Sequence, residues 1–232
     1  ENHNEMTKGI PELKTALSEL YNNSNSIELN NNKFFALASN KLFIQIDSTR
    51  RIDISLENTE FTKSTMIAYD IIANNISKRP IYFSGYSVDD FFGFNDYLSN
   101  EGIVYRLVNE KQLPQDIIVE IKAGRVNSKR MYENLMHNYS WKNFDKKGVY
   151  YDELHRSIIE LYAEQMSLLA HTLLAEGDTS KSLAVANLCL EKLPPSIHNY
   201  PYILAEISLV YGQLGYEEQS MQLMQSVLNN FE

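Results

Sequence analysis

The sequence predicts an α+β fold, with a small mixed sheet and helices in the N-terminal half and antiparallel helical pairs in the C-terminal half. Two observations support this prediction. Before residue 125, short segments alternate apolar and polar residues, as strands with one buried face do. After residue 150, apolar residues recur with the period of an amphipathic helix. We therefore expect an α+β domain over residues 1–125 and a helical domain over 126–232, packed together.

The N-terminal half is predicted to hold two helices and several short strands. A helix is expected over residues 10–21, because Pro11 suits its first turn and apolar residues recur on one face. A second helix is expected over 61–76, with Thr62 as its N-cap. Residues 52–83 suit a βαβ-like unit. The expected strands lie at 26–29, 34–38, 41–46, 51–56, 81–83, 102–108 and 117–121, with a hairpin turn at 47–50 and an aromatic helix or turn at 89–98.

The C-terminal half reads as helical hairpins with a repeat-like pattern. Gly177 and Gly215 end two similar apolar segments, and their offset, 215 − 177 = 38, is close to the roughly 34-residue period of tetratricopeptide pairs. An ordinary helical bundle is the alternative. We expect Ser182 and Ser220 to face the preceding helix of each pair. Helices are expected at 128–138, 152–176, 182–193, 201–214 and 217–231, with Leu183, Leu190, Met221 and Leu228 buried between pairs.

Composition excludes some classes of function. The chain has 232 residues, of which 44% are hydrophobic and 22% charged, as in a globular protein. Its net charge of −9 argues against a nucleic-acid partner, because binding phosphates requires clustered Lys and Arg. The single cysteine, Cys189, cannot form an internal disulfide and is expected to be a buried, inert thiol. Because the chain begins at Glu1 without Met, we expect it to be excised from a longer protein.

No recognisable motif predicts a catalytic, cofactor-binding or metal-binding residue. The sequence lacks the glycine-rich phosphate loops, the HExxH motif and paired cysteines, and its five histidines are scattered. One segment, residues 86–97, sets carboxylates among aromatic rings, as carbohydrate-binding or carbohydrate-active sites can do. The favoured alternative is a capped aromatic turn that fills the core. The candidate residues are Asp89, Asp90, Asp96, Tyr86 and Tyr97.

Several segments, in this order and spacing, resemble one family. They are KRPIYF (78–83), YL (97–98), EGIVYRLV (101–108), MYENLM (131–136), Trp141 and GVYYDE (148–153). Together they resemble the soluble C-terminal region of large bacterial multispanning membrane proteins related to protein O-mannosyltransferases, formerly a domain of unknown function. The resemblance extends from about residue 10 onward.

This resemblance implies a place and a role for the chain. In that family the acid proposed for catalysis lies in the membrane part, and no residue here matches it, so no catalytic role is carried over. The resemblance implies a domain on the periplasmic side of the inner membrane, attached to a membrane-embedded parent and ending in tetratricopeptide-like helices. We therefore expect a non-catalytic accessory domain of a membrane glycosyltransferase-like protein that binds an acceptor protein or another protein partner. A carbohydrate-binding or carbohydrate-active role for residues 86–97 is the alternative.

Overall fold

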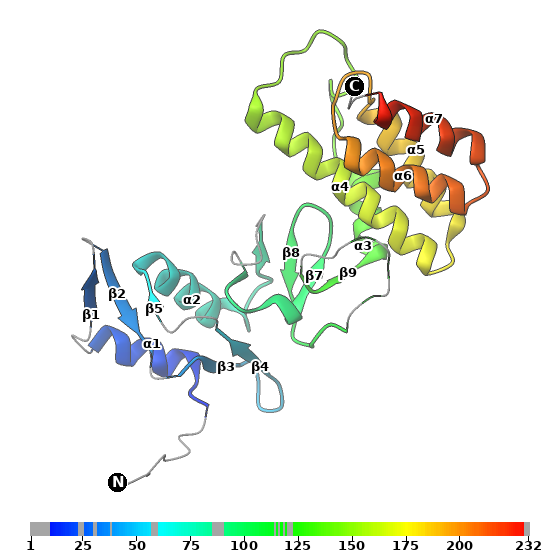
Figure 1. Cartoon of the computed structure of the whole chain (residues 1–232). Coiled ribbons are helices and arrows are strands. Elements are labelled where there is room, and N and C mark those ends of the chain that lie inside the picture. The colour runs from blue at the N-terminus through cyan, green and yellow to red at the C-terminus, as the bar shows by residue number, and fades with distance from the viewer. Residues whose placement is uncertain are drawn as a thin grey trace, which may run out of the picture. The chain divides into compact units, whose positions relative to one another are not determined.

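The computed structural model describes residues 10–22, 26–29, 32–37, 39–56, 60–84, 91–113, 115, 117, 119 and 123–229. Strands dominate its N-terminal half and helices its C-terminal half, which confirms the α+β class (Figure 1). Contacts divide the chain into two units. The first unit comprises Glu1–Ser99 and Tyr105–Leu113, and the second comprises Asn100–Val104 and Pro114–Glu232. The predicted division into domains over residues 1–125 and 126–232, packed together, stays a prediction.

The first unit begins with helix α1 (Leu13–Asn22), close to the predicted bounds. Its apolar residues Leu13, Ala16, Leu17 and Leu20 are all buried, as their helical spacing predicts. The sheet β1-β2-β5 follows, with antiparallel strands β1 (Ser26–Leu29), β2 (Asn32–Ala36) and β5 (Glu60–Phe61).

Strands β3 (Lys41–Gln45) and β4 (Arg51–Ser55) form a separate antiparallel hairpin. Leu42 lies opposite Ile54 and Ile44 opposite Ile52, so four buried side chains share one face. Their alternation with exposed residues confirms the predicted strands.

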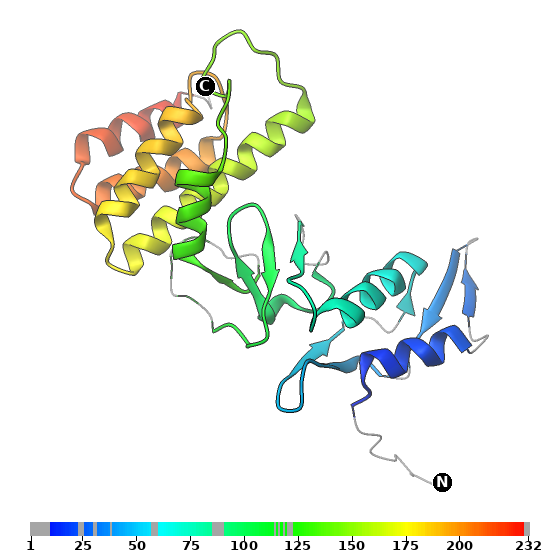
Figure 2. The ribbon, with the colours of Figure 1, turned by 180° about the vertical axis from the view of Figure 1, so that it is seen from behind.

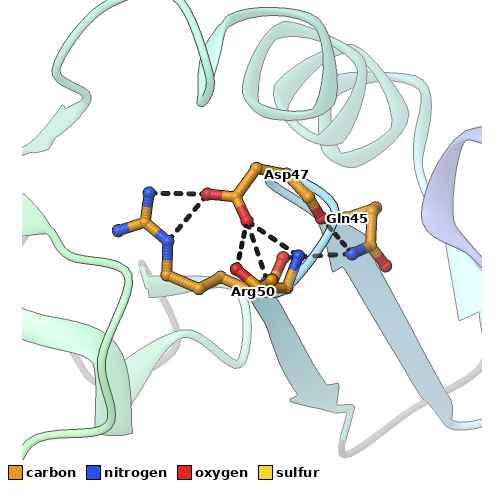
Figure 3. Close-up of polar contacts among 4 residues, drawn as sticks. Gln45, Asp47 and Arg50 are labelled. Atoms are coloured by element: carbon orange, nitrogen blue, oxygen red, sulfur yellow. Dashed lines mark hydrogen bonds and ion pairs between the residues drawn. The ribbon is translucent and has the colours of Figure 1, made fainter.

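Asp47 holds the turn between β3 and β4 (Figure 3). Its Oδ1 accepts hydrogen bonds from the backbone amides of Thr49 at 2.9 Å and Arg50 at 3.0 Å, and its Oδ2 accepts from Arg50 Nε at 2.7 Å. Gln45 Nε2 also donates to the Asp47 carbonyl. The Thr49 amide, then the Arg50 side chain, hold the pKa of Asp47 well below its usual range. This turn confirms the predicted hairpin.

The expected βαβ unit is wrong. Helix α2 (Lys63–Asn75) forms as predicted, with Thr62 Oγ1 accepting the Thr65 amide at 3.2 Å. However, strands β4 and β6 (Tyr82–Phe83), before and after it, belong to different sheets. Strand β6 pairs antiparallel with β8 (Tyr105–Leu107), which lies beside β7 (Leu98–Asn100). The expected strand at 117–121 lies partly outside the described residues.

The second unit is mainly helical. Strand β9 (Arg125–Val126) leads into α3 (Ser128–Glu133) and a π-helical turn, Asn134–Asn138. Four longer helices follow: α4 (Glu153–Ala175), α5 (Thr179–Lys192), α6 (Pro201–Gln213) and α7 (Glu217–Leu228). They share one core of aliphatic residues, Cys189 and Tyr200. Burial raises the pKa of the Cys189 thiol to about 12, so it stays protonated near neutral pH.

The two hairpins α4–α5 and α6–α7 turn at equivalent glycines. Gly177 and Gly215 both have φ of +83°, the left-handed conformation that favours glycine after a helix. Ser182 is fully buried and its Oγ donates to the Ala170 carbonyl of α4 at 2.7 Å. Ser220 Oγ would lie 3.3 Å from a Cβ at Gly212 on α6. Both serines therefore face the preceding helix, as predicted.

Part of the predicted burial pattern is wrong. Met221 and Leu228 are 66% and 56% exposed, and Leu183 and Leu190 are only partly buried. Helix α7 is the last described helix, and within the described residues no helix follows it. The side chains that fill the core from α5 and α7 are Val185, Ala186, Cys189 and Val227.

A loop, Asn100–Val104, belongs to the helical unit although its neighbours in sequence do not. Asn100 is fully buried and its Nδ2 donates to Gln165 Oε1 of α4 at 2.9 Å. Its Oδ1 accepts the Gly102 amide at 3.0 Å. Gly102 has φ of +128°, and a Cβ there would lie 2.7 Å from the Tyr139 hydroxyl. Only glycine therefore fits this buried turn without a shift of Tyr139.

Candidate functional site

The acidic and aromatic segment at 86–97 is only partly described. Tyr86, Asp89 and Asp90 lie outside the described residues. The Asp96 carboxylate is 61% exposed and forms an ion pair with Lys111 Nζ at 2.7 Å. The Tyr97 hydroxyl accepts a long hydrogen bond, 3.4 Å, from the Asp53 amide. The structure thus places Asp96 in a surface ion pair and Tyr97 against strand β4.

Two described phenylalanine rings within this segment belong to the core. Phe91 and Phe94 are fully buried. Their ring centroids lie 4.8 Å from Tyr105 and 6.1 Å from Phe83, respectively. Tyr69 Oη donates to the carbonyl oxygen of Phe92 at 2.7 Å. These contacts agree with the favoured alternative, an aromatic turn that fills the core, while a carbohydrate role for residues 86–97 stays a prediction.

A different surface lies at one end of the helical unit. Since α4, α5 and α6 run alternately up and down, α4 and α6 are parallel and begin at the same end (Figures 1 and 2). Asp152 caps α4, accepting the His155 amide at 2.9 Å, and Pro201 occupies the first turn of α6. The Asp152 cap and Pro201 therefore set where α4 and α6 begin.

Three large side chains are exposed at this end. Tyr150, just before α4, is 83% exposed. Leu154 in the first turn of α4 is 67% exposed, and Tyr202 in the first turn of α6 is 76% exposed. Isolated exposed apolar residues are common, but three at one end of a helical unit, with Tyr150 on the rim of a cavity, mark a candidate contact surface. We call Tyr150, Leu154, Tyr202 and the adjoining cavity the helix-start surface.

The cavity has a volume of about 360 Å³. Its floor consists of Ile159, His198 and Tyr200, each at least nine-tenths buried. The remaining lining residues form its rim: Val149, Tyr150, Tyr151, Arg156, Glu160, Ile197 and Asn199. The cavity therefore combines buried side chains at its floor with polar groups at its rim, which can orient a ligand.

Hydrogen bonds fix the polar side chains of this cavity. His198 Nε2 lies 2.6 Å from the Phe144 carbonyl oxygen, and its ring packs 5.4 Å from Tyr151. Arg156 Nε donates to the Tyr151 carbonyl at 3.0 Å. Among the described residues, no ion pair joins Arg156 to Glu160, although they are one turn apart on α4. The terminal guanidinium nitrogens and the carboxylate are therefore available to a ligand.

The sequence interpretation missed this site. Its residues come from the loop before α4, the first turns of α4 and the loop 194–200 before α6. The sequence showed only that tyrosines cluster at each helix start. Tyr150 and Tyr151 precede the cap Asp152, and Tyr200 and Tyr202 flank Pro201. Only the parallel arrangement of α4 and α6 brings these tyrosines together. Among the described residues, no cluster of three or more His, Cys, Asp or Glu is arranged to hold a metal ion.

The elements define an α+β domain whose C-terminal half consists of helical hairpins. The family model for TMEM260-associated domain 2 matches residues 3–130, and the chain belongs to this family. Searches of curated proteins and of solved structures each gave no match. The matched range ends before the helix-start surface. No helix in the described part of the chain is both long and apolar enough to span a bilayer.

Proposed function

We propose that this chain is a non-catalytic accessory domain of a membrane glycosyltransferase-like protein on the periplasmic side, and that its helix-start surface binds an acceptor protein or another protein partner. The observation that carries the proposal is a cavity of about 360 Å³ with exposed Tyr150 on its rim, at the end of the helical unit where Leu154 and Tyr202 are also exposed. Membership of TMEM260-associated domain 2 and the resemblance to relatives of protein O-mannosyltransferases support the link to such a parent.

The composition of the helix-start surface suits a protein ligand. Tyrosine offers a large, rigid contact area and a polar hydroxyl, and it is enriched among the residues that dominate binding energy. The cavity beside Tyr150 has the depth to take one side chain of the partner. Arg156 and Glu160 at its rim provide one donor group and one acceptor group for the partner backbone.

The tetratricopeptide-like character of the hairpins supports the same role. Equivalent glycines 38 residues apart, each at φ +83°, support such a repeat, and small side chains, Ser182 and Ser220, stand at the helix contact in place of the Ala usual there. Stacked helical pairs bury a continuous core and present the first helix of each pair as a binding surface. Helices α4 and α6 are those first helices here, and both contribute to the helix-start surface.

A double substitution tests this proposal in the full-length parent. Tyr150→Ala with Tyr202→Ala is expected to lower acceptor glycosylation at least tenfold at limiting acceptor, since truncating central aromatic residues costs about 2 kcal/mol or more. Membrane insertion should be unchanged. The matched control is Met221→Ala with Leu228→Ala on α7, whose side chains are 66% and 56% exposed.

Deleting residues 150–232 gives the coarser version of the test. It is expected to impair glycosylation of acceptors while the membrane part still inserts. Unchanged glycosylation of every acceptor would contradict the accessory role. Equal loss in the Tyr150/Tyr202 and Met221/Leu228 variants would contradict the assignment of the surface while leaving the role open to another face.

A further inference from the structure

Helix α2 in the first unit exposes two isoleucines. Ile67 and Ile71 lie one helical turn apart and are 56% and 54% exposed. The opposite face of α2 is buried through Met66, Tyr69, Ile72 and Ala73, so the core does not require the exposed pair. An exposed polar residue would serve folding equally well at either position. The pair therefore points to something that covers this face.

Basic residues stand at both ends of this isoleucine pair. Lys63 begins α2, and Lys78 and Arg79 follow its end; all three are exposed. In the described part of the chain, none of the three forms an ion pair. The helix itself carries one carboxylate, Asp70, which is half-buried and accepts the Asn74 amide at 3.0 Å.

This local charge is opposite in sign to that of the whole chain. Three cations flank the apolar pair without an ion-pair partner among the described residues, although Arg79 Nε donates to Asn75 Oδ1 at 2.9 Å. The chain as a whole carries a net charge of −9. An apolar strip with Lys and Arg on its borders is the composition of helices that lie in the interface of a bilayer. The long lysine and arginine side chains can reach lipid phosphates while the helix backbone stays at the surface.

We propose that this face of α2 rests on an anionic membrane surface. Ile67 and Ile71 enter the boundary between headgroups and acyl chains, and Lys63, Lys78 and Arg79 contact lipid phosphates. Two side chains insert weakly, so the contact orients a domain that is already held close to the bilayer, where the effective concentration is high. This inference rests on the proposed attachment to a membrane-embedded parent, but it does not depend on the helix-start surface in the second unit.

An environment-sensitive fluorophore reports insertion directly. Ile67→Cys in the full chain is labelled with NBD; Cys189 is fully buried, and its raised thiol pKa keeps it unreactive. A terminal His tag holds the chain on vesicles with nickel-chelating lipid, so that a weak contact is populated. We compare phosphatidylcholine vesicles with vesicles of equal parts phosphatidylcholine and phosphatidylglycerol. Matched labels stand at Tyr21→Cys on α1 and Met221→Cys on α7.

The expected result is a brighter, blue-shifted emission at position 67 on anionic vesicles, with unchanged emission at positions 21 and 221. No response at 67, an equal response at all three positions, or a response only to an added protein partner would overturn the proposal. A response of equal size on pure phosphatidylcholine would also overturn it, because it would remove the role of the cations.

A charge-matched pair of variants separates a specific contact from overall charge. The triple variant Lys63→Gln, Lys78→Gln and Arg79→Gln should weaken insertion about fivefold for each cation removed. The control removes three exposed lysines elsewhere: Lys14→Gln, Lys129→Gln and Lys147→Gln. Both variants should melt like the wild type. Equal weakening in both would overturn the assignment to α2.

Discussion

The two units of the chain hold their cores together in different ways. The helical unit joins helices that follow each other in the chain, with α4 against α5 and α6 against α7. The N-terminal unit combines local hairpins, β1–β2 and β3–β4, with contacts between residues that are farther apart in sequence. Tyr69 Oη donates to the Phe92 carbonyl, and the Leu107 amide donates to the Ile81 carbonyl at 2.9 Å.

This difference has consequences for stability and for folding. Contacts between successive helices close short loops, whereas the aromatic core of the first unit must order long segments before its rings meet. We therefore expect the helical unit to form first and to resist opening longer. The predictions below test this contrast, beginning with the largest expected effect.

Phe94→Ala should have the largest effect. Phe94 is fully buried among the rings of Phe83 and Tyr69, so its loss leaves a cavity that costs about 3–5 kcal/mol in the free energy of unfolding. Hydrogen exchange monitored by mass spectrometry should show lost protection in residues 10–99 and little change in residues 150–229.

The control for this substitution is Tyr21→Ala, because Tyr21 is an aromatic residue of the same unit that is 59% exposed. It should change the free energy of unfolding by less than about 0.5 kcal/mol. Equal loss of protection in both units after Phe94→Ala would show that they unfold together, and the contrast would then fail.

Ser182→Leu should have the largest effect in the helical unit. The larger side chain overfills the contact between α4 and α5 and removes the hydrogen bond to Ala170, which should cost about 1–3 kcal/mol. Ser180→Leu is the matched control, because Ser180 is exposed on the same helix. The melting temperature measures both, and equal shifts would mean that Ser182 does not mark the helix contact.

Alanine substitutions at one glycine in each unit compare the units at a similar, positive φ. Gly93 has φ of +77° and Gly177 has φ of +83°, so alanine is strained at both positions by about 1 kcal/mol. At Gly93 a Cβ would also lie 2.7 Å from the Ser55 carbonyl oxygen, whereas nothing lies within 4 Å at Gly177. Chemical denaturation should therefore show that Gly93→Ala costs more, about 2–3 kcal/mol in total.

The sequence predicted the fold best where periodicity alone decides it. The helical period placed α1, α2 and α4 to α7, and strict alternation placed β3 and β4 with their turn at Asp47. Strand pairing was not readable, because β4 and β6 carry no signal that assigns them to separate sheets. Burial on α7 was also misjudged: Met221 and Leu228 have a helical spacing, but a period cannot say whether another helix will cover them.

The candidate site was less predictable than the fold. Asp96 drew attention as a carboxylate among aromatic residues, yet Lys111 pairs with it at the surface. Tyr150 and Tyr202 are 52 positions apart in sequence (202 − 150), and only the parallel course of α4 and α6 joins their neighbourhoods. A site made by tertiary packing of loops leaves no fixed spacing to detect.

The smallest predicted effect concerns pH and the helical unit alone. His171 on α4 is 3% exposed, and burial lowers its pKa below the usual 6.5, although Nε2 contacts the Glu206 carbonyl oxygen at 3.0 Å. The unfolded chain then binds more protons than the folded chain as pH falls below 6.5, so this group reduces stability in mildly acidic solution. Glu206 acts oppositely, because burial raises its carboxyl pKa and favours the protonated carboxyl in the folded chain.

His171→Gln keeps a polar group near the Glu206 carbonyl but cannot gain a proton. The variant should therefore lose less stability than the wild type as the pH falls through 6.5, where the imidazole of the unfolded chain gains its proton. Urea denaturation at several pH values measures the slopes, with His137→Gln as the exposed histidine control. If the free energy of unfolding changes with pH to the same extent in His171→Gln and in the wild type, burial does not hold the imidazole neutral. The contact between α4 and α6 would then admit solvent to His171.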